Sequence, residues 1–234
     1  ADLPVLKEKD IWWTNPTFMD SDAHFLGFTR FYLSPWINTR LVKSSEEPKS
    51  WYDLLQPRWR GKITVGDPNI SNLLYYFVLF VEQKRLEPDF LKKLSTQDII
   101  FSRGTMDSVE KAARGDVDLA VLTSGGEGGN LVKEGAPIKA IDIKEGVIAN
   151  LHAINVVKGA PHPAAGRLFI NWILSDEGQR VWAEAKSIGV LRKGIPDPSP
   201  AGARLEPQNP LILTAEAGEA VSKAFQDKLY VPLF

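Results

Sequence analysis

The feature of this sequence that most restricts its fold is the mostly apolar segment 117–122, which leads straight into the glycine-rich stretch 123–129. A strand with one face in water alternates apolar and polar residues, whereas a strand covered on both faces is apolar along its length. The composition of this segment therefore predicts a buried strand in a parallel sheet that has helices on both sides.

Further strand and helix signals alternate along the chain, which predicts an α/β fold with mainly parallel sheets flanked by helices. The clearest helix is indicated by Ala165, Leu168, Phe169, Trp172 and Ile173, which recur at helical spacing. The other expected strands are 62–65, 99–101, 138–143 and 149–157, and the other expected helices are 73–85, 105–115, 175–185 and 217–225.

The overall composition excludes several classes of site and partner. The 28 basic and 29 acidic side chains leave a formal charge of -1, so nucleic acid is not an expected partner. The absence of cysteine excludes disulfides and thiolate chemistry. The longest apolar run, Leu73–Val81, is too short to cross a bilayer, and the first residues have no signal-peptide pattern. We therefore expect a soluble protein from which any export signal has been removed.

Two stretches resemble a known family. The first runs from Trp51-Tyr52-Asp53-Leu54-Leu55 to Trp59-Arg60-Gly61-Lys62-Ile63. The second contains Lys158-Gly159-Ala160-Pro161-His162-Pro163, then 169–175, Glu177-Gly178-Gln179 and finally Val190-Leu191-Arg192. Together they resemble the type II periplasmic solute-binding proteins of ABC importers, in the group that includes ferric-ion, thiamine and sugar-phosphate binders. The resemblance covers about Asp10 to Pro200.

The resemblance implies two α/β lobes that are joined by two crossover strands and close on a ligand by hinge motion. Residues 1–41 would be the remainder of lobe 1 with the outward crossover, 42–147 lobe 2, and 148–234 the return crossover with the C-terminal part of lobe 1. The family's opening βαβαβ segment has no match here, which implies that lobe 1 lacks that segment.

As for function, the resemblance implies the substrate-binding component of an ABC importer, which captures a small polar or anionic solute and delivers it to a membrane permease. It further implies a periplasmic protein, or an extracellular one that is membrane-anchored in a Gram-positive organism, and a monomer when full length. A ligand-sensing domain of a receptor or regulator is an alternative.

Ligands of such folds meet the loops at the carboxyl ends of parallel strands, where helices begin. Three segments of the second lobe qualify, and for each of them plain helix capping or a flexible turn is the structural alternative. The glycine-rich segment is the preferred site, because its amides and hydroxyls suit an anionic or hydroxylated group. The candidates are Asn69, Ser71, Asn72, Thr105, Thr123, Ser124, Gly125 and Gly126.

Two further pairs are candidates because residues two apart on a strand face the same side. Asn150 and His152 lie on the expected return crossover, and Arg30 and Tyr32 on the outward one. A structural hydrogen bond or a surface ion pair explains each of them equally well.

No metal, cofactor or catalytic site is expected. Ferric-binding relatives carry a tyrosine pair at the glycine-rich position, whereas Tyr75 and Tyr76 fall within an apolar helix. The three histidines, 24, 152 and 162, have no ligand spacing. A ferric binder with non-tyrosine or exogenous-anion ligands remains an alternative. Because nucleophile elbow, paired acids, P-loop and dinucleotide fingerprint are all missing, an enzyme is not expected.

Overall fold

The computed structural model describes residues 3–8 and 26–234, and this part of the chain divides into two compact units. The first contains the described residues up to Phe31 together with Asn150–Ser199, and the second contains Tyr32–Ala149 and Pro200–Phe234. Two of the boundaries fall inside β1 (Leu26–Asn38) and β6 (Ile148–Ile154). These strands are the segments that were expected to form the two crossovers.

Parallel pairing organises the sheet of the second unit. β2 (Ile63–Gly66) lies between β3 (Ile100–Ser102) and β4 (Leu119–Ser124) and is parallel to both. β4 also pairs antiparallel with β1, which carries β5 (Ile138–Ala140) antiparallel as well. β7 (Leu211–Ile212) is parallel to β6, and the strand order is β3-β2-β4-β1-β6-β7. The expected α/β class is confirmed, with a sheet that is mixed.

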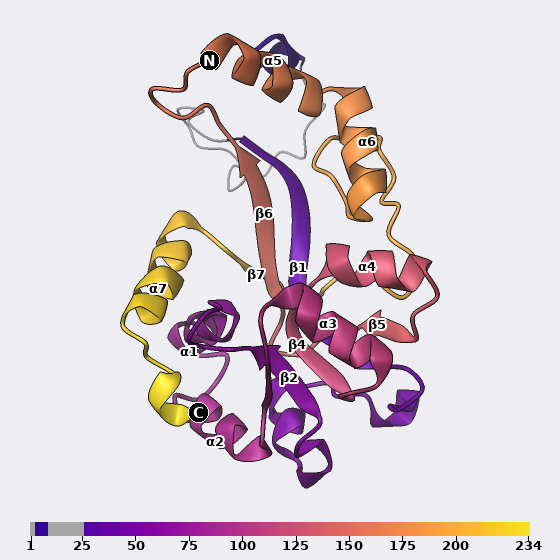
Figure 1. Cartoon of the computed structure of the whole chain (residues 1–234), viewed down its shortest axis with the longest axis vertical. Helices are drawn as coiled ribbons and strands as arrows, with labels where there is room; N and C mark the ends of the chain where they lie inside the picture. Colours follow the sequence, from indigo (N-terminus) through magenta and orange to yellow (C-terminus); the bar gives the residue numbers. More distant parts are fainter. Residues whose placement is uncertain (1–2, 9–25) are drawn as a thin grey trace. The chain divides into compact units, whose positions relative to one another are not determined.

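Helices flank this sheet (Figure 1). α3 and α4 contact each other, and α3 also packs on β2 and β4. The α-helices of the second unit are α1 (Phe77–Glu82), α2 (Phe90–Leu94), α3 (Thr105–Arg114), α4 (Gly125–Lys133) and α7 (Ala215–Gln226). Its short 3-10 turns are Ser44–Glu46, Trp51–Leu55, Pro57–Trp59, Leu73–Tyr76, Ser95–Gln97 and Val231–Leu233.

Three expected elements differ from the observed ones. The helix predicted over 73–85 is a 3-10 turn followed by the short α1, because its bulky aromatic residues are poor helix formers and Asn72 provides no side-chain cap. The strand predicted over 138–143 is only β5. The glycine-rich turn predicted after Leu122 is in fact the start of α4, which Ser124 caps by accepting a hydrogen bond from the Gly126 N–H.

Trp36 of β1 explains why α4 has a glycine at position 128. The indole is fully buried among Val109, Ala112 and Ala120. A Cβ atom at Gly128 would lie 2.3 Å from the Trp36 ring. Glycine at this position therefore lets the helix backbone lie directly on the indole, which fixes α4 against the sheet.

The C-terminal segment from Pro200 belongs to the second unit, whereas the sequence had assigned it to the first lobe. α7 packs on α1, and the Tyr75 ring centroid lies 5.4 Å from that of Phe225 and 5.3 Å from that of Tyr230. Burial raises the pKa of Tyr230 to about 12. Buried aromatic contacts of this kind stabilise the packing of a terminal segment. The contact joins distant segments, so no periodicity in the sequence predicts it.

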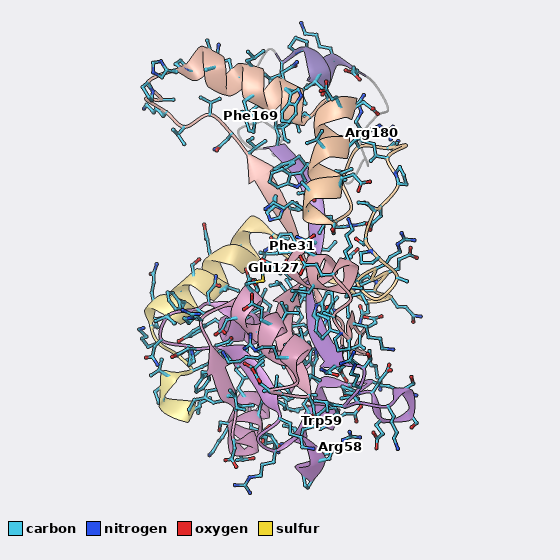
Figure 2. All side chains as sticks on the ribbon, turned by 45° about the vertical axis from the view of Figure 1, so that its right-hand side comes forward. Phe31, Arg58, Trp59, Glu127, Phe169 and Arg180 are labelled. Carbon is cyan, nitrogen blue, oxygen red and sulfur yellow. The ribbon has the colours of Figure 1, made fainter. Side chains whose placement is uncertain are left out.

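The described part of the first unit contains two α-helices, the short 3-10 helix Pro4–Lys7 and the ends of β1 and β6 around a small core. α5 (Pro163–Ile173) and α6 (Asp176–Lys186) match the expected helices, and Ser175 caps α6 by accepting from the Gly178 N–H at 3.2 Å. The core of this unit is formed by Leu3, Val5, Leu26, Phe28, Ile170, Ile173 and Leu174. Phe169, labelled in Figure 2, is 51% exposed, and Leu168 is 73% exposed, so α5 keeps an apolar outer face.

The helices described by the structure are all too short or too polar to be candidates for crossing a membrane.

The contact between Trp36 and Gly128 generates a test of the packing. Gly128→Ala should lower the free energy of unfolding by about 1–3 kcal/mol, because a methyl group must be forced into a filled core. Gly125→Ala is the matched control in the same helix, since a Cβ there meets nothing within 4 Å. Urea unfolding of both variants measures the difference; equal stabilities would contradict the packing account.

Candidate ligand-binding site

The candidate site is the edge of the second unit where three parallel strands end. β2 ends at Gly66, β3 at Ser102 and β4 at Ser124. Because the strands are parallel and adjacent, their carboxyl ends meet at one edge of the sheet. The Asp67 N–H donates to the Ser102 carbonyl at 2.8 Å, which ties two of these ends together.

A distortion in β4 immediately precedes this edge. Ser34 pairs with Thr123 and Trp36 with Ala120, so two residues of β4 lie opposite one residue of β1. One of the two, Leu122, has a φ of 53° although it is neither glycine nor asparagine. Bulges and left-handed residues of this kind are concentrated beside functional sites, where they redirect side chains.

The loop before the 3-10 turn at Leu73 is held by its own hydrogen bonds. The Asn69 side-chain amide and backbone N–H both donate to Asp67 Oδ1, at 3.0 and 2.8 Å. Ser71 Oγ accepts from the Leu73 N–H at 3.3 Å, and Asn72 is exposed. Asn69 and Ser71 therefore stabilise the loop through local hydrogen bonds. Contact of Asn69, Ser71 and Asn72 with a ligand stays a prediction.

α3 begins with a cap that the sequence placed elsewhere. Thr105 was predicted to cap the helix, but Gly104 occupies the capping position and Thr105 is the first helical residue. The Asp107 carboxylate instead accepts from the Arg103 N–H at 2.9 Å and lies 2.7 Å from Lys111 Nζ. The Lys111 hydrogen bond is the main reason that the pKa of Asp107 is lowered, and the Arg103 N–H adds to it.

The two helix starts are joined by a residue that sequence reasoning missed, Glu127. Its Oε1 accepts a hydrogen bond from Thr105 Oγ1 at 3.2 Å, and its Oε2 is buried without a hydrogen-bond partner among the residues the structure describes. Thr123 is fully buried, and its Oγ1 likewise has no partner in the described part. Figure 2 labels Glu127 beside the ribbon of α4. The Ser124-x-x-Glu127 spacing marks the helix start, but it does not indicate the bond to Thr105.

Four candidates lie at two neighbouring helix starts, Thr105 at the start of α3 and Ser124, Gly125 and Gly126 at the start of α4. Ser124 Oγ is engaged by the Gly126 N–H at 3.4 Å. Helix starts offer N–H donors and a positive dipole end, whereas Glu127 offers a carboxylate. The arrangement can therefore bind a polar solute through both donors and an acceptor.

The candidates outside this edge lie in other surroundings. Arg30, Asn150 and His152 belong to the first unit and Tyr32 to the second. His152 stacks on Phe31 with ring centroids 4.5 Å apart, and Asn150 Oδ1 accepts from the neighbouring Leu151 N–H at 2.7 Å. Arg30 is exposed. Their contact with a ligand remains a prediction.

The tyrosine pair is part of the core. Tyr75 is fully buried and donates its hydroxyl to the Pro68 carbonyl at 3.0 Å, and Tyr76 is also buried. Within the described ranges, no group of three or more histidine or acidic side chains could hold a metal ion. His24 lies outside the described residues.

A hollow of about 510 Å³ lies at the opposite edge of the sheet, between Leu55 and the residues from Asp89 to Gln97. The Gln97 carbonyl accepts from the Gly61 N–H just before β2 begins, which places this hollow at the amino ends of the strands. It is therefore separate from the candidate site.

Comparison with known proteins identifies the family. The model of the bacterial extracellular solute-binding proteins matches residues 7–209, which is most of the chain. This chain belongs to that family. A curated relative of this solute-binding protein, an uncharacterized protein of Haemophilus influenzae, is 29% identical over 179 residues, or 70% of this chain and 49% of the relative. The chain therefore spans about half the length of that relative.

Solved structures of similar fold include iron-bound HitA from Pseudomonas aeruginosa, at a TM-score of 0.72 and 22% identity over 92% of this chain and 72% of that one. AfuA from Actinobacillus pleuropneumoniae, with exogenous fructose-6-phosphate bound, follows with a TM-score of 0.66 and 18% identity, over 94% and 76%. The substrate-binding protein of an ABC transporter from Agrobacterium tumefaciens reaches 0.74 at 12% identity, over 95% and 70%. The solute-binding protein thus has the type II periplasmic binding fold.

The start of α3 generates a test with a defined pH dependence. Asp107→Asn should cost about 1 kcal/mol of unfolding free energy at pH 7, because it weakens the bonds to Lys111 and the Arg103 N–H. The folded-state pKa is lowered, so this stability is present above the ordinary value of 3.8 and is lost as the pH falls through the folded-state value.

Urea unfolding of wild type and Asp107→Asn at several pH values checks this. The control is Glu110→Gln on the same helix. The Glu110 side chain is 44% exposed, and its ion pair with Arg114 is long, at 3.8 Å. A difference between wild type and Asp107→Asn that stays constant down to pH 2 would show that the carboxylate charge is not the cause.

Proposed function

We propose that this protein captures a small polar solute at the carboxyl edge of β2, β3 and β4 and delivers it to the membrane permease of an ABC importer. The observation that carries the proposal is the hydrogen bond between Thr105 and Glu127, which joins the starts of α3 and α4 at this edge. Strand ends and helix starts supply backbone donors, and the carboxylate supplies an acceptor.

The division into two units supports a binding mode in which lobes close on the solute by hinge motion. The unit boundaries inside β1 and β6 are where such a hinge would act, because a few residues of each strand would absorb the change in backbone angles. The lobe assignment that we propose keeps 42–147 in the second lobe and adds the docked segment from Pro200.

The proposed place of action is outside the cytoplasm, in the periplasm or at the cell surface, as the name of the family implies. The role is binding and not catalysis. Similar structures have titles that name iron, fructose-6-phosphate and an ABC transporter, and these titles set the classes of solute to test first.

A second candidate function is ligand sensing. One structure of similar fold, at a TM-score of 0.63 and 15% identity, is titled a two-component system protein that mediates signal transduction. The same edge of the sheet would bind the ligand in a sensor, so the two functions differ in the partner. Stimulation of a permease and its ATPase in proteoliposomes by the loaded protein would decide for the importer.

Binding itself is tested by thermal unfolding and calorimetry with sugars, sugar phosphates, carboxylates, amines and ferric chelates. A solute at about 100 times its Kd should stabilise the folded protein by about 2.7 kcal/mol. For a protein of this size that is an increase in Tm of about 5–10 °C. Failure of every class to shift the Tm would contradict the proposed function.

A further inference from the structure

The two oxygens of the Glu127 carboxyl are in different situations. Oε1 accepts from Thr105 Oγ1 at 3.2 Å, whereas Oε2 is buried and has no hydrogen-bond partner within the described residues. Buried polar atoms in folded proteins are almost always paired, because an unpaired one keeps its full desolvation cost. The Glu127 Oε2 at the candidate site therefore needs a partner that the described residues do not provide.

Helix capping does not account for this carboxylate. Ser124-x-x-Glu127 has the spacing of a capping box, in which the acid binds the backbone N–H of the first residue. The same spacing at Ser50 and Asp53 does form that box, with Asp53 Oδ2 accepting from the Ser50 N–H at 3.0 Å. Glu127 instead turns its Oε1 to Thr105, which belongs to the neighbouring helix.

Glu145 is a partly buried acid of the same unit. Both oxygens of Glu145 are bonded, one to the Ser50 hydroxyl at 2.8 Å and the other to the Trp51 N–H at 3.0 Å. The Lys111 ammonium is engaged by Asp107, at 2.7 Å. No ion pair to Glu127 is found in the described part of the chain.

We propose that Glu127 Oε2 accepts a hydrogen bond from a donor group of the bound solute, an ammonium or a hydroxyl. A carboxylate in the first turn of a helix offsets the positive end of the helix dipole. It also repels a second anion placed against it. The start of α4 therefore selects solutes that carry a donor there and discriminates against phosphate or carboxylate at the same position.

This inference rests on the proposed function and sharpens it. The glycine-rich segment alone favours an anionic or a hydroxylated group equally, and Glu127 removes the anion from that choice. Thr105 is a positioning residue in this account, because its hydroxyl fixes the orientation of the carboxylate.

The test is calorimetry on the full chain with defined probes. Putrescine represents the ammonium, fructose and glycerol represent the hydroxyl, and inorganic phosphate and citrate represent the anions. We expect a donor probe to bind and Glu127→Gln to weaken it about 10-fold to 100-fold, since a hydrogen bond to a charged group is lost. Glu134→Gln, at the exposed far end of α4, should leave the affinity unchanged.

A structural role for Glu127 predicts a different pattern. It would lower the Tm of the solute-free protein and leave the affinity of the folded fraction intact. We expect the reverse, with little change in the Tm of the solute-free protein and loss of the solute-induced shift. Should Glu127→Gln not fold, Thr105→Val provides the second variant, with an expected several-fold loss of donor-probe affinity.

Each result decides something. A donor probe that binds Glu127→Gln as tightly as wild type overturns this inference and leaves the proposed function standing. Tight binding of phosphate or citrate that Glu127→Gln leaves unchanged does the same. If no probe of any class binds, the proposed function fails and the inference fails with it.

Discussion

The packing of Trp36 against the backbone of Gly128 determines how α4 lies on the sheet of the second unit. The indole fills the space beneath α4, and only a residue without a side chain lets the helix lie directly on it. This contact sets the distance of α4 from the sheet and brings its first turn within hydrogen-bond reach of α3. The bond between Thr105 and Glu127 depends on that placement.

The chemistry of the site follows from opposing electrostatic contributions. The starts of α3 and α4 present backbone N–H groups and positive dipole ends, which alone would favour an anion. Asp107 and Glu127 place a carboxylate in the first turn of each helix. Asp107 is bonded internally, to the Arg103 N–H and Lys111, whereas Glu127 Oε2 has no partner among the described residues. The two helix starts therefore differ in what they offer to a solute.

Much of the fold could be predicted from local patterns in the sequence. The apolar segment around Leu119, the helical spacing in α5 and the cap at Ser175 each report on neighbouring residues. The features that escaped prediction depend on contacts between distant segments. Trp36 packs on Gly128 of the helical glycine-rich stretch, and the last helix contacts the second unit through Phe225 and Tyr75. No periodicity in the sequence predicts either contact.

The candidate site shows the same division. The α/β pattern predicted that strand ends and helix starts would line the site. The contact of Glu127 could not be predicted, because its partner Thr105 lies 22 residues away. Backbone amide chemical shifts on adding a solute locate the residues that contact it. We expect the largest changes at 103–107 and 124–127. Changes confined to the opposite edge, around Leu55 and Gln97, would contradict the proposed site.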